Sequence, residues 1–281
     1  MNHEIDVLVT TKDRHSEIAL MVQSLRTQTF QKWNLIILDD ASGTPIQACG
    51  FLSMLLNQVK LEGHKVKHLR NEISYGVCAA RNTLIDAQLN WNSSADLILR
   101  ADDDVIFEPD YLERLIKVID SGYDLASGIV PICGQPIPVR KIDKIMPIIN
   151  EHKLDENGNL TQLNDDCGYK YTEAKVLPTH HFRTNCMYKK EVHEKVRHPT
   201  NLTPVGFREE GFFSMRAILL GYKIGVDTGA VAYHAVCQSG GCRYPNYGEC
   251  VQTDEKTWRD WIKEKFIEHG DFIADYNGRT K

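Results

Sequence analysis

The sequence has 281 residues, of which 42% are hydrophobic and 25% are charged, a balance typical of soluble globular proteins. This length allows one large or two fused α/β domains with a substantial core. The formal net charge of −5 argues against a nucleic-acid-binding surface, because neutralising phosphates requires clustered Lys and Arg side chains.

The chain carries no pattern of an export signal or a membrane span. Its opening, MNHEIDVLVTT, leads directly into a strand-like segment, and no apolar stretch approaches the roughly 18 residues that cross a bilayer. The eight cysteines are scattered without a tight framework, which favours reduced thiols and a cytoplasmic location. Peripheral contact with a membrane stays open, and nothing in the sequence sets the oligomeric state.

Apolar strands alternate with amphipathic helices through roughly the first 125 residues, which predicts a mostly parallel sheet flanked by helices. The expected strands are Ile5–Thr10, Trp33–Leu38, Val66–Leu69 and Asp96–Ala101. Four helices are expected between and after these strands. The first follows an N-cap at Ser16, and the next two span Phe51–Val59 and Val77–Leu89. The fourth has Leu112, Leu115, Ile116 and Ile119 on one face and ends before Gly122.

The pattern loosens between Pro131 and Pro178, where we expect an irregular excursion with a hairpin or loop around Asn157 and Gly158. Regular elements then return in a helix closed by a glycine, two strand-like pieces and a last helix. They are Phe212–Leu220 with Gly221, Tyr222–Val226, Ala230–His234 and Asp254–Glu268. In the last helix Trp258 and Trp261 are expected to pack against the body of the protein, although docking on a membrane or stacking on a sugar are alternatives.

Polar side chains follow three of the expected strands where each strand ends. Thr10 ends the first strand, Asp39 follows the second, and the run from Asp102 to Asp104 follows the fourth. Ligands bind at the carboxyl edge of open α/β sheets. The sequence therefore predicts a binding site at this edge.

The acidic run is the centre of the predicted site. Asp102, Asp103 and Asp104 repel one another, so they require either a compensating cation or full solvation. Alternation along an extended chain places Asp102 and Asp104 on the same face. Hard cations such as Mg²⁺ or Mn²⁺ bind carboxylate oxygens and leave positions for substrate phosphates. The alternative is a solvated acidic turn before the following helix.

The chain resembles family 2 glycosyltransferases of the GT-A fold. The resemblance rests on the opening strand, the segments DDAS, GVCAARN and ADDDV in this order, and FREEGFFSMRAILLGYKIG with the nearby His234. It covers most of the chain except the middle excursion. It implies a Rossmann-like, mostly parallel central sheet, with a nucleotide-sugar-binding half over residues 1–130 and a mixed acceptor-binding half over residues 131–281.

The resemblance assigns roles to residues of the first half. Thr10 and Thr11 lie where the nucleotide base binds, and Asp39, with Asp40 beside it, matches the acid that hydrogen-bonds uracil. Arg81 matches a basic residue near the diphosphate, or is a helix Arg paired with a carboxylate. Asp102 to Asp104 correspond to the DxD motif, whose last Asp coordinates Mn²⁺ or Mg²⁺ and whose first approaches the ribose or donor sugar. Arg100 stands where many relatives have another acid, which leaves the division of roles among the three aspartates open.

The resemblance also assigns roles in the second half. Glu210 matches the general base, commonly an Asp, that deprotonates the acceptor hydroxyl, with Glu209 as its neighbour. A simpler interpretation is that both acids stabilise the start of a helix. His234 matches a further metal ligand. An alternative is a structural zinc site formed by His234 with Cys237, Cys242 and Cys250, although this set lacks the usual tight Cys pair. Arg243, in the Gly-rich loop that follows, is a candidate phosphate contact.

The function implied is an inverting, metal-dependent transfer of a sugar from a nucleotide diphosphate donor, a UDP-sugar, to an acceptor hydroxyl. The acceptor could be a glycan, a lipid-linked or protein substrate, or a small molecule. One alternative is an inactive carbohydrate- or nucleotide-sugar-binding protein that kept the fold. Another is a sugar-nucleotide nucleotidyltransferase, which should carry a Gly-rich basic loop after the first strand, where this chain has TTKDRHSE.

Overall fold

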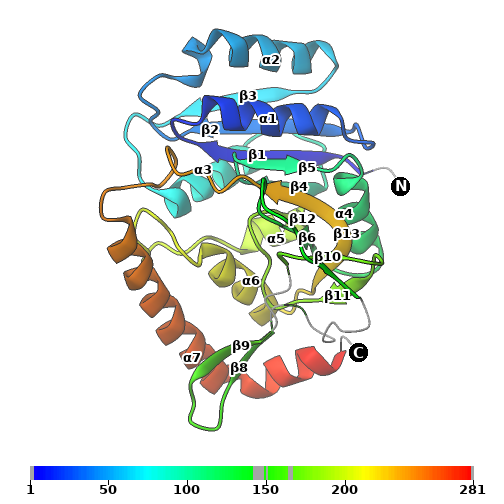
Figure 1. The fold of residues 1–281 in the computed structure, drawn as a ribbon, viewed down its shortest axis with the longest axis vertical. Coiled ribbons are helices and arrows are strands. Elements are labelled where there is room, and N and C mark those ends of the chain that lie inside the picture. The colour runs from blue at the N-terminus through cyan, green and yellow to red at the C-terminus, as the bar shows by residue number, and fades with distance from the viewer. Residues whose placement is uncertain (1–2, 142–148, 150, 164–166, 280–281) are drawn as a thin grey trace.

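The computed structural model describes residues 3–141, 149, 151–163 and 167–279. Over these residues the chain forms a mixed α/β fold around one large sheet (Figure 1). The sheet has the order β11-β13-β6-β12-β4-β1-β2-β3, and β5 pairs with β13 at its side. Its strands are β1 (Ile5–Thr11), β2 (Trp33–Asp39), β3 (Val66–Arg70), β4 (Leu97–Ala101), β5 (Val105–Phe107), β6 (Leu125–Ile129), β11 (Val176–Pro178), β12 (Cys186–Lys189) and β13 (Ile224–His234).

The sheet is mostly parallel, as the alternation of strands and helices predicts. Strands β3, β2, β1 and β4 are parallel neighbours, and β6 is parallel to β13. Strand β12 lies antiparallel between β4 and β6 and joins the two groups. Strands from both predicted halves of the chain therefore share one sheet, and the division near residue 130 remains a functional prediction.

Seven helices within the described ranges cover the sheet: α1 (His15–Arg26), α2 (Gly50–Leu61), α3 (Val77–Leu89), α4 (Tyr111–Asp120), α5 (Lys190–Lys195), α6 (Glu209–Leu219) and α7 (Tyr247–Arg279). Alternate side chains of β1 enter different cores because successive residues of a strand point to opposite faces. Val7 and Val9 pack in the core with α1, α2 and α4, whereas Leu8 packs in the core with α3, α5, α6 and α7. The sheet is thus buried on both sides, as expected for parallel strands.

Most elements of the first half lie close to their predicted positions, and the helix α3 (Val77–Leu89) matches its prediction at both ends. The predicted start of the first helix, with Ser16 as its N-cap, was wrong. The helix begins at His15 with Arg14 in the cap position, and no side chain caps it by a hydrogen bond. Ser16 lies inside the first turn and donates to Glu17 instead. A short 3₁₀ turn at Ile46–Ala48 precedes α2.

From residue 125 onward the chain contains more strands than the pattern indicated. Strands β6 and β12 were not predicted, and the two pieces around Val226 and Ala230 form one strand, β13, with a register shift between Asp227 and Val231. Gly158 forms the turn of the expected hairpin between β8 (Glu151–Leu154) and β9 (Leu160–Leu163). A second small sheet pairs β7 (Val139–Arg140) with β10 (Lys170–Tyr171). Residues 142–148, 150 and 164–166 of the predicted excursion lie outside the described residues.

The last helix packs onto the body of the protein, as expected from its two tryptophans. Trp258 is buried and contacts the ring of Phe212 in α6 edge-on, and Trp261 packs against the same ring. The helix extends further than predicted, from Tyr247 to Arg279, with a non-helical residue at His269. Among the residues that the structure describes, no helix is both long and apolar enough to cross a membrane.

Candidate active site

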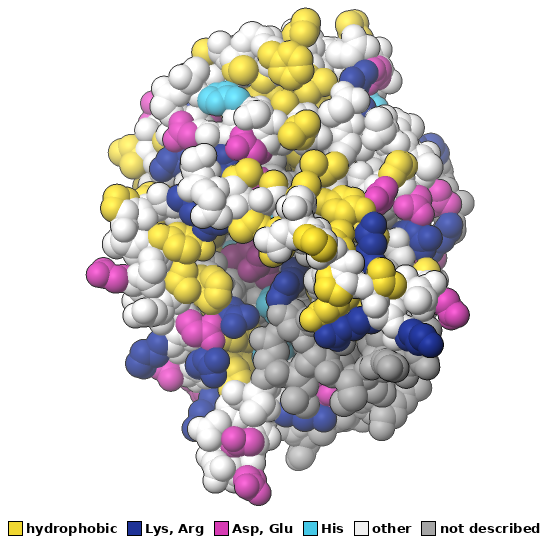
Figure 2. Space-filling model, viewed as in Figure 1, with side chains coloured by type: hydrophobic (Ala, Val, Ile, Leu, Met, Phe, Trp, Pro, Cys, Tyr) yellow, Lys and Arg dark blue, Asp and Glu magenta, His cyan; other side chains and the backbone are white. Residues whose placement is uncertain are grey.

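A cavity of about 530 Å³ opens at the carboxyl edge of the sheet, where the sequence predicts a site. Figure 2 shows acidic side chains at the floor of a hollow near the middle of this face. The walls come from the turns after β1 and β4, the start of α3, the segment before α6, and the end of β13 with the loop that follows. Predicted site residues that line the cavity are Thr10, Thr11, Asp40, Arg81, Asp102, Asp103, Asp104, Glu210 and His234.

Asp102, Asp104 and His234 form a cluster that could hold a metal ion. One ligand atom from each lies within 4.8 Å of the others, and the turn between β4 and β5 provides both aspartates. His234 arrives from a distant part of the sequence because β13 pairs with β5, which sets His234 opposite Val105. His234 Nε2 then lies 3.2 Å from Asp104 Oδ1. Two carboxylates and an imidazole form a donor set suited to Mn²⁺, and the carboxylates alone also suit Mg²⁺.

The three aspartates differ in pKa. Burial raises the pKa of Asp102 to about 6 and that of Asp103 to about 7. Burial acts in the same direction on Asp104. However, hydrogen bonding and charge from His234, together with the charge of Arg14, outweigh burial and lower the pKa of Asp104 to about 2. Asp104 therefore has the lowest pKa of the three.

Asp103 lies outside this three-residue cluster, and its carboxylate faces the turn after β1. Its Oδ2 accepts a hydrogen bond of 2.7 Å from the hydroxyl of Thr11, and its Oδ1 accepts one of 3.0 Å from Arg14. Both oxygens are thus occupied by the turn after β1. This geometry separates Asp103 from Asp102 and Asp104, a distinction that the sequence alone left open.

A buried ionic network lies behind the cavity and separates the two glutamates of α6. Glu209 is buried and accepts hydrogen bonds from Arg81 and, at 2.7 Å, from Arg100. Arg81 also donates to Asp102 at 2.7 Å, so it joins the acidic cluster to the start of α6. Glu210 lines the cavity with 23% of its side chain exposed, and its nearest cation is Arg100, 3.6 Å away. Of the two predicted candidates for a base, Glu210 alone lines the cavity.

Asp39 and Asp40 also lie in different surroundings. Asp39 is fully buried and binds the amides of Ser42 and Ile46 and the guanidinium of Arg70. These hydrogen bonds outweigh the effect of burial and lower the pKa of Asp39. Asp40 lines the cavity instead. The lining of the cavity thus includes Asp40 but not Asp39, the residue predicted to hydrogen-bond the nucleotide base.

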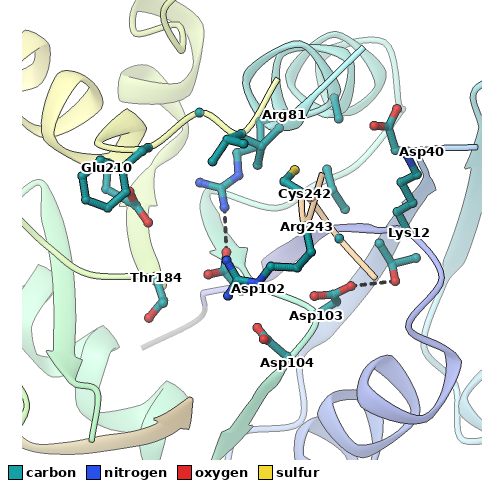
Figure 3. A pocket seen from close by; sticks show the side chains of 18 of the residues that line it. Lys12, Asp40, Arg81, Asp102, Asp103, Asp104, Thr184, Glu210, Cys242 and Arg243 are labelled. Carbon is teal, nitrogen blue, oxygen red and sulfur yellow. Dashed lines mark hydrogen bonds and ion pairs between the residues drawn. The ribbon is translucent and has the colours of Figure 1, made fainter. Parts of the chain in front are cut away.

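Figure 3 shows how the labelled side chains are distributed around the cavity. In this view Asp40 and Lys12 lie on one side, Glu210 and Thr184 on the other, and Arg81 with the three aspartates between them. His181 and Arg183 line the wall near Thr184. The cavity therefore has an end formed by the first half of the chain and an end formed by the second half.

Sequence reasoning missed two cations of the site, Lys12 and Arg14, which line the cavity directly after β1. Their signal was present, since they follow Thr10 and Thr11 at the same strand end. The cysteines considered for a zinc site are free thiols, and the metal cluster found within the described residues combines His234 with aspartates rather than with cysteines.

Comparison with known proteins decides the family. Residues 6–197 match the family model described as "Glycosyl transferase family 2". The chain belongs to glycosyl transferase family 2. This family 2 chain is 27% identical over 165 residues to the bifunctional glycosyltransferase pgtA of Dictyostelium discoideum. The matched segment covers 56% of this chain and 20% of pgtA. It is also 28% identical over 116 residues to an uncharacterized glycosyltransferase of Haemophilus influenzae, and this match covers 41% of this chain and 34% of that protein. The matches thus span about a third or less of the length of these two relatives.

Solved structures share the fold of this family 2 chain, which is the GT-A fold. The structure of GalNAc-T7 with UDP, GalNAc and Mn²⁺ superposes with a TM-score of 0.65 at 14% identity, over 98% of this chain and 55% of that chain. The structure of Staphylococcus aureus TarS residues 1–349 in complex with UDP-GlcNAc gives a TM-score of 0.53 at 16% identity, over 82% of this chain and 58% of that chain. At these identities the likeness concerns the fold.

Proposed function

We propose that the chain is a glycosyltransferase that moves a sugar from a UDP-sugar donor to an acceptor hydroxyl, with inversion at the anomeric carbon. The observation that carries this proposal is the cavity itself, which gathers a cluster that could hold a metal ion, several cations and the partly exposed carboxylate of Glu210 at the ligand-binding edge of the sheet. The UDP or UDP-sugar in the GalNAc-T7 and TarS structures supports the choice of donor.

Asp104, Asp102 and His234 are the residues proposed to hold Mn²⁺ or Mg²⁺. A bound divalent ion would supply a Lewis acid that stabilises charge on the leaving diphosphate. Arg81 lies beside the cluster and keeps Asp102 oriented through a hydrogen bond of 2.7 Å. Lys12 and Arg243 line the same part of the cavity and add positive charge to it, and within the described residues neither forms an ion pair with a carboxylate. These cations would attract and position an anionic donor.

Glu210 is the proposed general base. An inverting transfer requires a group on the acceptor side that takes the proton of the attacking hydroxyl. Glu210 lines the cavity across from Asp40, and its carboxylate is partly exposed to that space. Glu209 is held by two guanidiniums away from the cavity, so it supports the start of α6 and the orientation of Arg81.

The base-binding end of the cavity is proposed to lie at Asp40. Asn71 and Ser74 donate hydrogen bonds of 2.7 and 2.6 Å to its two oxygens and fix its orientation. Tyr244, from the loop after β13, lies within 3.2 Å of the Ser74 hydroxyl and beneath the ammonium of Lys12. A nucleotide placed at this end would extend past the aspartates toward Glu210.

A cytoplasmic location is part of the proposal. All eight cysteines lie in described parts of the chain and are free thiols, which supports a reducing compartment.

A panel of nucleotide sugars tests this function. Thermal stability is measured with Mn²⁺ and each of several UDP-, GDP- and other nucleotide sugars, because a ligand that binds the folded state raises the melting temperature. The expected result is a clear stabilisation by one UDP-sugar that depends on Mn²⁺, accompanied by release of UDP. Binding without release of UDP, with any of a wide range of acceptors present, would favour a non-catalytic binding protein instead. No stabilisation by any nucleotide sugar would contradict the proposal.

A further inference from the structure

Arg14 occupies an unusual place for an arginine at the start of a helix. It precedes α1 directly, and only 9% of the residue is exposed. Its guanidinium lies between the acidic cluster and the segment that follows β13, at residues 237–241. A buried guanidinium is stable only when its nitrogens are paired, so its contacts define what it holds in place.

One side of the guanidinium fixes two carboxylates. Nη1 lies 3.0 Å from Asp103 Oδ1 and 3.2 Å from Asp104 Oδ2. The backbone amide of Cys237 also donates to Asp104 Oδ2, at 3.2 Å. The two oxygens of Asp104 are therefore divided, since Oδ2 is held by Arg14 and Cys237 while Oδ1 faces His234.

The other nitrogens hold the segment 237–241. Nε donates to the carbonyl of Ser239 at 3.0 Å, and Nη2 donates to the carbonyl of Cys237 at 3.2 Å. The amide of Gly241 donates to the carbonyl of Lys12 at 2.7 Å, which adds a backbone contact beside them. The next residues of the chain, Cys242 and Arg243, line the cavity.

Two glycines allow this close packing. Gly240 has a φ of +67°, and a Cβ added there would lie 2.7 Å from the carbonyl oxygen of Asp13. Gly241 has a φ of +56°, and its added Cβ would lie 2.9 Å from Cζ of Arg14. The segment is thus shaped to lie directly against the turn that carries Arg14.

We infer that Arg14 is a positioning residue that couples the metal site to the segment 237–243. It orients Asp104 so that Oδ1 faces the metal cluster, and it holds Cys242 and Arg243 at the wall of the cavity. The inference rests on the proposed metal site and goes beyond it, because Arg14 itself is not a ligand. Lysine cannot take over this role, since one ammonium lacks the planar fork that reaches two carboxylates and two carbonyls together.

Metal affinity measured without any substrate tests the first half of the inference. Mn²⁺ is titrated by calorimetry into the wild type, Arg14→Gln, Arg14→Lys and the control Arg26→Gln. Arg26 ends the same helix and pairs with Glu62 far from the site. Loss of a partner that orients a metal-binding carboxylate typically lowers metal affinity 10–100-fold. We expect a weakening on this order for Arg14→Gln, a smaller one for Arg14→Lys, and a change within about twofold for Arg26→Gln.

Thiol labelling tests the second half. The labelling rate of Cys242 is followed by mass spectrometry of its peptide, and it should rise in Arg14→Gln but not in Arg26→Gln. Gly240→Ala provides a variant that keeps every charge. The added methyl group should displace the segment from Asp13, raise the labelling rate of Cys242 and raise KM for the donor more than it lowers kcat.

The outcomes separate this inference from the proposed function. If the wild type does not bind Mn²⁺, the proposed metal site is wrong. If the wild type binds Mn²⁺ and a folded Arg14→Gln binds it equally well, the inference about Arg14 alone is overturned. If Arg14→Gln does not fold, unchanged Cys242 labelling and donor KM in Gly240→Ala overturn it.

Discussion

Two adjacent glutamates at the start of α6 occupy different environments although their side chains are chemically identical. Glu209 is buried between Arg81 and Arg100, whereas Glu210 reaches the cavity. Residues one apart on a helix point in directions about 100° apart, so the first can enter the core while the second lines the site. The family resemblance already pointed to Glu210 as the base, and the difference in environment supports that proposal and gives Glu209 a structural place.

Replacing each glutamate by glutamine should separate these roles. Glu210→Gln should lower kcat by roughly 10²–10⁴-fold, the usual contribution of a general base, while affinity for UDP stays unchanged. Glu209→Gln should instead destabilise the protein by about 3–5 kcal/mol, because it leaves Arg81 and Arg100 buried without their shared partner. Steady-state kinetics, UDP titration and chemical denaturation measure these effects. A normal transfer rate in Glu210→Gln would move the base elsewhere.

The sequence identified acidic residues of the site better than basic ones. Asp102 and Asp104 were predicted to share a face because side chains alternate along an extended chain, and they do come together with His234. Arg14 follows the same strand end as Thr10 and Thr11, but its partners at Asp103, Asp104 and Ser239 lie about 90 to 225 residues away. Contacts of that range follow from the fold and not from local spacing.

At the scale of elements, the pairing of β13 with β6 and β5 positions His234. Strand β13 is parallel to β6 up to Asp227, shifts register, and then pairs antiparallel with β5. Gly128 in β6 lies at this shift, where a Cβ would be 2.2 Å from the carbonyl oxygen of Ala230. Only glycine allows the two backbones to approach this closely.

Gly128→Ala should therefore damage both stability and the site. Overpacking of this kind costs about 1–3 kcal/mol, and a forced shift of β13 should also move His234 away from Asp104. We expect a lower melting temperature and weaker Mn²⁺ binding. Gly50→Ala is the control, because no atom lies within 4 Å of its added Cβ at the start of α2, and it should be nearly neutral. An unchanged melting temperature in Gly128→Ala would show that β13 adapts freely.

Long amphipathic elements could be predicted from the sequence, and short buried strands could not. Helix α4 has apolar positions at helical spacing, and the predicted face of Leu112, Leu115, Ile116 and Ile119 is buried. The limits of α3 were also predicted correctly. Strands β6 and β12 have only five and four residues, and neighbours on both sides bury them. Such short runs lack the alternation that marks a half-buried strand, and their pairing depends on distant segments.

The whole molecule buries several histidines in their neutral form. Burial lowers the pKa of His193 to about 4, and it lowers the pKa of His198 well below its ordinary value of 6.5. The ring of His193 lies against Tyr188 in the core that α3, α5 and α6 share. A histidine that is neutral when folded but protonated when unfolded links stability to pH.

Stability should therefore fall as the solution is acidified from pH 6.5 to about pH 4. In this range the unfolded chain binds a proton at His193 that the folded chain excludes, at a cost of about 1.4 kcal/mol for each pH unit below 6.5. The stability that neutral His193 contributes is fully present above pH 6.5. It is lost by about pH 4, where the folded state also takes up the proton. Urea denaturation across this range should give a shallower dependence for His193→Gln. An identical slope for both proteins would contradict neutral burial of His193.

Asp104 is the centre of the proposed metal-dependent site. The measurement that tests this site most directly is UDP release from the UDP-sugar selected by the panel, with and without Mn²⁺, in the wild type and in Asp104→Asn. We expect Mn²⁺ to stimulate the wild type strongly, whereas Asp104→Asn should stay folded and lose this stimulation. Normal Mn²⁺-stimulated release by Asp104→Asn would contradict the proposed site.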